Sequence, residues 1–136
     1  MPHSVAMFDP DTFKSEPART RWRFHTTDRL GQFDIAVPSD DDLNPHAAAL
    51  THLEAALTRI DALYDAALPV AEHGWVARYN GPLRDRSAWS LVRIFADETG
   101  SLVLTLHEGD FDTYCVWDVA FTNGHPTRAL QRPYGG

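Results

Sequence analysis

Two short segments near the start of the chain, RWRFH (21–25) and QFDIAV (32–37), alternate between polar and apolar positions. Alternation with a period of two is typical of strands that bury one face. The segment TDRLG between them is a loop sequence, so the pattern predicts an antiparallel β-hairpin that ends at Pro38. The apolar positions of this hairpin are Trp22, Phe24, Phe33, Ile35 and Val37.

A change to helical periodicity follows the hairpin. Asn44 is suited to be the N-cap of a helix, and Pro45 is suited to the first helical position. The acidic residues 40–42 would lie near the positive end of the helix dipole. The sequence therefore predicts one long helix of about six turns that ends at Pro69. Its apolar stripe, at spacings of three and four, consists of Leu50, Leu53, Leu57, Ile60 and Tyr64.

Four further segments resemble strands joined by turns: GWVARY (74–79), SAWSLVRIF (87–95), SLVLTLH (101–107) and TYCVWDVAF (113–121). The predicted order is ββαββββ. Strands that follow one another through short turns form antiparallel sheets, and a single helix packs on one face. We therefore expect an α+β fold of two layers, with a mainly antiparallel sheet of five to six strands and one long helix. Residues 19–126 form the expected domain, between a loosely attached arm (1–18) and a C-terminal tail (127–136).

Two of these predicted strands are apolar on both sides. In the second, Trp89, Leu91 and Phe95 alternate with Val92 and Ile94. The last strand places Cys115, Trp117, Val119 and Phe121 on one side and Tyr114, Val116 and Ala120 on the other, interrupted by Asp118. Strands of this kind lie in sheets that are covered on both faces. One helix covers one face, so the arm, the tail, sheet curvature or another protein must cover the second.

Composition narrows the possible functions. The 136 residues carry a net charge of −7, which disfavours binding to nucleic acids and to anionic membranes. The only cysteine, Cys115, excludes an internal disulfide, and its phase with Trp117 predicts a buried, unreactive side chain. The chain lacks a secretion signal and an apolar run long enough to span a membrane. We expect a cytoplasmic protein without cofactors.

The densest polar cluster is HEGDFD, in which His107, Asp110 and Asp112 could hold a divalent cation for hydrolysis. The spacing matches no established metal loop, and an acidic, solvated loop is the favoured interpretation. His46 and His52 lie six residues apart on the predicted helix and cannot share a metal ion on one face. Whether His25, His73 and His107 converge in space stays open.

Other motifs point away from common enzyme classes. The chain contains no nucleophile elbow, no Walker loop and no dinucleotide-binding glycine pattern. Four cationic residues alternate along the first predicted strand: Arg19, Arg21, Arg23 and His25. We interpret them as charges that keep an exposed edge strand from pairing with other chains. The chain begins with the order strand, strand, helix, as ubiquitin-like carrier proteins do, and it ends in Gly135 and Gly136. A carrier that is activated at this C-terminal end therefore stays open.

Residues 28–126, from DRLGQFDIAV to WSLVRIFADETGSLVLTLHEGDFDTYCVWDVAFTNGHP, resemble small bacterial α+β domains of uncharacterised function, including immunity proteins of toxin systems. The resemblance rests on element order and apolar spacing. It implies a non-enzymatic protein that binds and blocks a cognate toxin. An acidic inhibitor would suit a basic toxin domain, because complementary charges speed encounter.

We therefore predict a protein-binding module that contacts its partner through a sheet face and acidic loops. A homodimer stays open, as do the metal-assisted hydrolase and the carrier. The predicted partner-binding residues are Trp89, Leu91, Phe95, Tyr114, Trp117, Asp97, Glu98, Glu108, Asp110 and Asp112.

Overall fold

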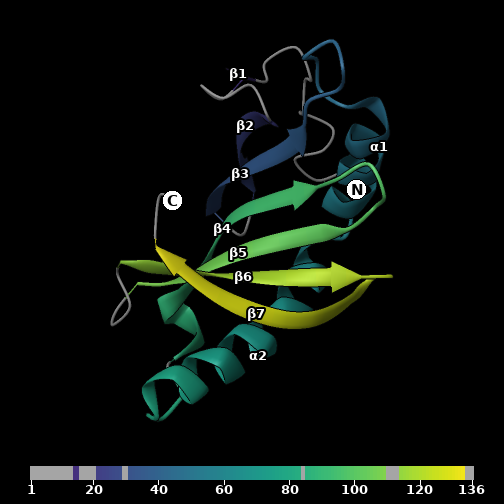
Figure 1. Ribbon diagram of the computed structural model, residues 1–136. Helices are drawn as coiled ribbons and strands as arrows, with labels where there is room; N and C mark the ends of the chain where they lie inside the picture. Colours follow the sequence, from purple (N-terminus) through teal and green to yellow (C-terminus); the bar gives the residue numbers. More distant parts are fainter. Residues whose placement is uncertain (1–13, 16–20, 29–30, 84, 110–113, 134–136) are drawn as a thin grey trace.

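The computed structural model describes residues 14–15, 21–28, 31–83, 85–109 and 114–133 (Figure 1). Seven strands form one sheet in the order β1-β2-β3-β4-β5-β6-β7, and two helices pack on it. The strands are β1 (Lys14–Ser15), β2 (Arg21–Asp28), β3 (Gly31–Pro38), β4 (Trp89–Ala96), β5 (Leu102–Glu108), β6 (Cys115–Thr122) and β7 (His125–Pro133). The helices are α1 (Ala47–Leu57), α2 (Ile60–Tyr79) and a short 3-10 helix, η3 (Arg86–Ala88).

The α+β class and the mainly antiparallel sheet are confirmed. Consecutive strands pair antiparallel except β3 and β4, which are parallel, with Asp34 opposite Arg93 and Ala36 opposite Phe95. Both helices lie in the connection between these two strands, because parallel neighbours need a crossover that passes over the sheet. The sheet is therefore mixed.

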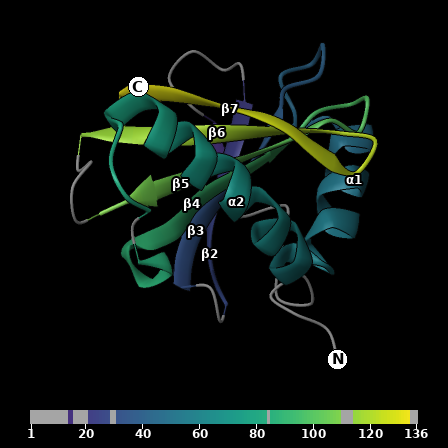
Figure 2. The same cartoon turned by 90° about the horizontal axis from the view of Figure 1, so that it is seen from below.

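The prediction of one long helix is wrong, since the chain forms two. Thr58 donates its hydroxyl hydrogen to the carbonyl of Ala55 at 2.6 Å, and Arg59 leaves the helical region with φ −132° and ψ 31°. A side chain that bonds a nearby carbonyl competes with the helical ladder. The break lets α1 pack against β3 and β4 while α2 packs against β5, β6 and β7 (Figure 2). One straight helix would not follow the twist of the sheet in this way.

The predicted helix ends are also wrong. The first helix begins at Ala47 with His46 as its N-cap, and Asp40 instead accepts the backbone N–H groups of Asp42 and Asn44, both at 2.9 Å. Pro69 lies inside α2, on its exposed side. A proline in a helix loses one hydrogen bond, but the buried residues on both sides of it hold α2 on the sheet.

As a consequence, the segment predicted as the strand GWVARY is the last part of α2. Its Trp75 continues the buried stripe of Tyr64, Leu68 and Ala71 at spacings of three and four. Residues 127–133, predicted as tail, belong to β7, and residues 14–15 of the predicted arm form β1. The sheet therefore has one strand more than the largest number expected.

One core lies between the helices and the facing side of the sheet. The sheet contributes alternate residues, of which Phe33, Ile35, Ile94, Leu104 and Leu106 are at most 1 % exposed. The helices contribute residues spaced by three and four: Ala49, Leu53, Ala56, Leu57, Ile60, Leu63, Tyr64, Ala67, Leu68, Ala71 and Trp75. We call the opposite side of the sheet the outer face.

Candidate protein-binding site

Strand β7 forms one edge of the sheet. It pairs with β6 over its whole length, from Thr122 opposite His125 to Cys115 opposite Pro133, and no described strand pairs with its other side. The opposite edge of the sheet is the two-residue strand β1. The nine residues of β7 are exposed or half-buried. A long edge strand offers unpaired backbone N–H and C=O groups to another chain.

Side chains on β7 alternate between the two layers. Ala129 packs against the core, while Arg128, Leu130 and Arg132 lie on the outer face. Leu130 is 54 % exposed. It is therefore the large apolar side chain that this edge presents to solvent.

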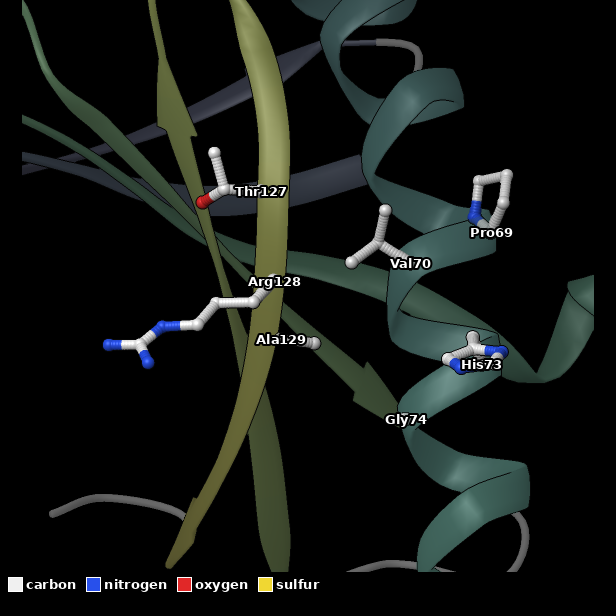
Figure 3. Close-up of a pocket in the computed structure, with 7 residues that line it drawn as sticks. All are labelled: Pro69, Val70, His73, Gly74, Thr127, Arg128 and Ala129. Atoms are coloured by element: carbon white, nitrogen blue, oxygen red, sulfur yellow. The ribbon is translucent and has the colours of Figure 1, made fainter.

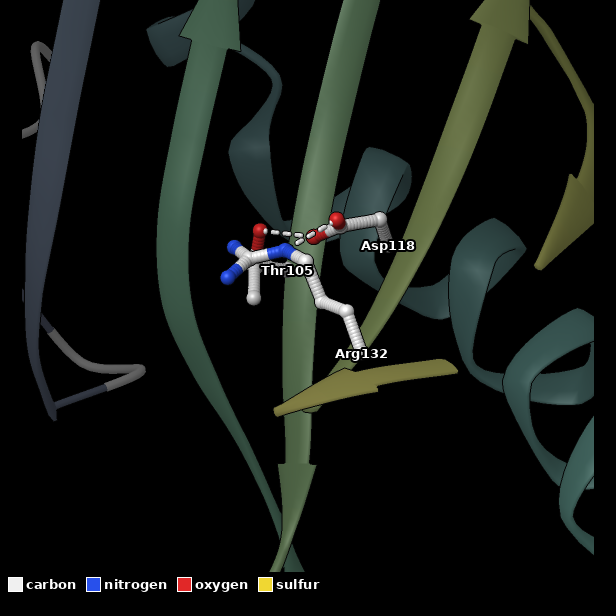
Figure 4. Close-up of polar contacts among 3 residues, drawn as sticks. All are labelled: Thr105, Asp118 and Arg132. Carbon is white, nitrogen blue, oxygen red and sulfur yellow. Dashed lines mark hydrogen bonds and ion pairs between the residues drawn. The ribbon is translucent and has the colours of Figure 1, made fainter. Parts of the chain in front are cut away.

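The outer face holds a polar group beside this edge. Asp118 accepts a hydrogen bond from the hydroxyl of Thr105 at 2.6 Å and forms a short ion pair with Arg132 (Figure 4). Thr105 is 2 % exposed, so Asp118 satisfies a hydroxyl that water hardly reaches. Arg132 is thereby used within the protein. In contrast, Arg128 is exposed, and no described residue forms an ion pair with it.

A groove separates β7 from α2. It has a volume of about 450 Å³ and is lined by Pro69, Val70, His73, Gly74, Thr127, Arg128 and Ala129. Val70 points from α2 toward the strand, Ala129 points from the strand toward α2, and Arg128 points away from the helix (Figure 3). The inner side of the groove is therefore apolar.

Gly74 permits the close approach of helix and sheet at this point. A Cβ atom there would lie 2.9 Å from Cζ3 of Trp117 and 3.6 Å from the Cβ of Ala129. Beyond it, a polar bridge joins the two elements: Gln131 donates to the Tyr79 hydroxyl at 2.6 Å and accepts from Nε of Arg78 at 3.3 Å. The bridge closes the groove toward the C-terminal ends of α2 and β7.

The aromatic and aliphatic residues predicted to bind a partner are divided by the sheet. Trp89, Leu91 and Trp117 are 6 %, 2 % and 3 % exposed and belong to the core under the helices. Phe95 lies half-buried on the outer face, opposite Ala36 and Val103. Tyr114, before β6, is 85 % exposed. Of these five, only Phe95 and Tyr114 offer surface to a partner.

The predicted acidic residues do not form one surface. Asp97 organises its own turn, since its Oδ1 accepts hydrogen bonds from the N–H groups of Thr99 at 2.9 Å and Ser101 at 3.0 Å. Glu98 is exposed beside it, whereas Glu108 is fully buried. Asp110 and Asp112 lie outside the described residues.

A second polar group lies where α2 meets the connection to β4. Glu72 is 6 % exposed, and Arg86 of η3 donates to its Oε1 at 3.1 Å. Burial, together with the carboxylates of Asp65 and Glu72, raises the pKa of Tyr64 from 10.0 to about 12. Hydrogen bonds from the backbone and hydroxyl of Ser87, both 3.0 Å, lower the pKa of Asp85. The Arg86–Glu72 ion pair ties η3 to α2, whereas the bonds between Ser87 and Asp85 lie within the start of η3.

The histidines of the described part do not converge. His73 is exposed on α2 beside the groove, while His107 lies half-buried on β5 and points to the outer face. Among the described residues, no group of three His, Cys, Asp or Glu side chains could hold a metal ion. Cys115 is half-buried. The side chains of 19–25 and the terminal Gly135 and Gly136 lie outside the part of the structure that is described.

The site was missed by sequence reasoning because β7 has little alternation. Its strand conformation follows from pairing with β6, and Pro126 and Pro133 made the segment resemble a tail. The nearest sequence indication was TNG before it, which forms the β6–β7 turn with Asn123 and Gly124 at positive φ.

Comparison of the chain with protein-family models, curated proteins and solved structures gives no match. Within the described residues, no helix is long and apolar enough to cross a membrane.

Proposed function

We propose that the protein is a non-enzymatic, cytoplasmic protein-binding module of the immunity type, which binds and blocks a cognate bacterial toxin. The observation that carries the binding role is the edge strand β7: nine residues long, paired on one side and bordered by a groove. Proteins usually blunt such an edge by shortness, charge, proline or bulges. In β7, prolines, irregular pairing and uncompensated charge occur at only a few positions.

Proline occurs in β7 only at Pro126 and Pro133, and the irregular pairing lies between Ala120 and Phe121 of the partner strand. The stretch 127–132 between the prolines retains every backbone N–H group. One of its two arginines, Arg132, is engaged by Asp118, so Arg128 alone provides an uncompensated charge. This stretch can therefore pair with another chain.

The immunity role is supported by the net charge of −7 and by the resemblance described above. A strongly acidic inhibitor attracts a basic toxin domain over several ångströms of solvent, which raises the association rate. Of the predicted contact residues, Glu98 and Tyr114 are exposed and therefore accessible to a partner.

The test is isolation of the tagged protein from its native host with whatever is bound to it, followed by reconstitution from purified components and calorimetry. We expect one protein to bind in a defined ratio, to arrest growth when expressed alone, and to lose this toxicity when the present protein is co-expressed. A partner that is chemically altered by the present protein would contradict the non-enzymatic role. A partner that is not toxic would contradict the immunity role, and failure to reconstitute any complex would contradict binding.

A further inference from the structure

We infer that the groove between α2 and β7 accepts an extended segment of the partner, which pairs with the outer edge of β7 as an additional strand and presents alternating apolar and acidic side chains. This inference rests on the proposed function, since it names the part of a partner protein that the edge recognises. Strand addition between an exposed edge and a neighbouring helix is a common mode of peptide recognition.

The two sides of the groove determine the pattern of the segment. Side chains of an added strand point alternately to the two sides of the sheet. On the helix side they would meet the apolar surface of Val70, Gly74 and Ala129, while the exposed His73 also lines the groove. The volume of about 450 Å³ lies within the usual range for ligand-binding pockets, about 300–1,000 Å³. Apolar side chains are therefore favoured at every second position.

On the other side, the added strand would face Arg128. This arginine ends a row across the outer face in which Ala36, Phe95, Val103 and Ala120 are successive neighbours in the sheet. The neighbours of Arg128 in this row are thus apolar, and none compensates its charge. An acidic side chain directly opposite on an added strand would do so, because cross-strand pairs of opposite charge are stabilising.

Charge also bears on whether a second copy of the chain could pair with this edge. In a symmetric antiparallel pairing of two β7 strands centred on Leu130, Arg128 of each copy lies opposite Arg132 of the other. Like charges placed directly opposite one another are destabilising. In that register, the charges of the strand favour an acidic segment over self-pairing.

The polar bridge further restricts how the segment lies. Gln131, Tyr79 and Arg78 join β7 to α2 at one end of the groove. The apolar side chains of the segment therefore enter beside 127–129, and the segment leaves the groove before Gln131. The stretch that contacts both elements is only a few residues long.

The probe for this inference is a soluble nine-residue peptide, the length of β7, in which valine alternates with glutamate and both ends are blocked. A peptide in which lysine replaces glutamate is the matched control. We expect the glutamate peptide at millimolar concentration to shift the amide resonances of 127–130 and 70–74, and to slow hydrogen exchange of β7. The lysine peptide should bind at least about threefold more weakly.

Two variants and one control locate the site. Arg128→Glu should weaken binding of the glutamate peptide by roughly three- to tenfold and improve binding of the lysine peptide. Ala129→Leu should weaken both peptides, because its side chain fills the groove. Arg59→Glu makes the same change in net charge at the exposed start of α2 and should leave binding unchanged. Dispersed amide spectra establish that each variant is folded.

Several outcomes would overturn the inference: no shifts in the groove, equal binding of the two peptides, or a concentration-dependent dimer that pairs through β7. The isolated partner separates this inference from the proposed function. If that partner binds the wild type, Arg128→Glu and Ala129→Leu with equal affinity, the binding role stands and the strand-addition site is wrong.

Discussion

Replacing Gly74 by alanine tests whether the close approach of α2 to the sheet is as tight as the structure indicates. In a helix interior, alanine is favoured over glycine by about 1 kcal/mol. Against this, the added Cβ would lie 2.9 Å from Cζ3 of Trp117, whereas ordinary contacts begin at 3.4 Å. The indole ring is 3 % exposed and has little room to move. Overpacking of this kind costs about 1–3 kcal/mol.

The two effects leave Gly74→Ala destabilised by about 1 kcal/mol, or a fall in Tm of roughly 3–6 °C for a domain of this size. Urea unfolding followed by circular dichroism measures the difference. Ala77→Gly, at an exposed position of the same helix, gives the propensity alone and should cost about 1 kcal/mol.

A double-mutant cycle isolates the contact. In a Trp117→Leu background the bulky ring is absent, so Gly74→Ala should stabilise that protein by about 1 kcal/mol. The cost of removing the ring is common to both proteins and cancels. If Gly74→Ala stabilises the wild type by the same amount as the Trp117→Leu protein, the proposed clash between helix and sheet is refuted.

Three further substitutions test other parts of the structure. Asp118→Ala leaves the buried Thr105 hydroxyl without its acceptor and should cost about 1–3 kcal/mol in urea unfolding, whereas a neutral result would contradict the polar group on the outer face. Leu53→Ala, at a fully buried position of α1, should cost about 2–5 kcal/mol in the same assay, and a loss below 1 kcal/mol would mean that this helix is loosely packed. The pKa of Tyr64 is raised in the folded state above its unfolded value. Its contribution to the free energy of unfolding is therefore complete below pH 10 and is lost as the pH rises toward 12. Tyr64→Phe should therefore lose less stability than the wild type between pH 10 and 12, and parallel pH profiles would contradict the shifted pKa.

Local patterns in the sequence were sufficient for the elements that bury one side. Strands β3, β4, β5 and β6 lie in the segments predicted to be strands, and the stripe from Leu53 to Tyr64 is buried as expected. The prediction that Phe95 shares a side with Trp89 and Leu91 is wrong, because the pairing of β4 shifts between Leu91 and Arg93. The predictions are wrong where long-range packing determines the secondary structure. A proline such as Pro69 usually ends a helix. Here the helix continues, because residues beyond the proline, such as Trp75, pack in the core. The break at Thr58 and Arg59 lets the two helices follow the twist of the sheet, which a local pattern does not reveal.

The candidate site depended on the same kind of information. An edge strand is defined by which strand lies next to it, and β7 obtains its conformation from β6. Its own sequence, with proline at both ends of 126–133 and two arginines between them, has the composition of a loop. The groove likewise combines residues more than fifty positions apart, since Val70 and Gly74 meet Ala129 only after α2 crosses the sheet.

The total charge and the local charge have different roles in the proposed complex. The net charge of −7 acts over distances up to the Debye length, about 8 Å at physiological ionic strength, and so affects how fast a basic partner arrives. Arg128 acts only on the side chain opposite it, and so affects how long the complex lasts. Added salt should therefore lower the association rate of the proposed partner, while Arg128→Glu should raise its dissociation rate. A partner can be basic as a whole and still offer an acidic residue at the edge of β7, because the two requirements are met by different parts of its surface.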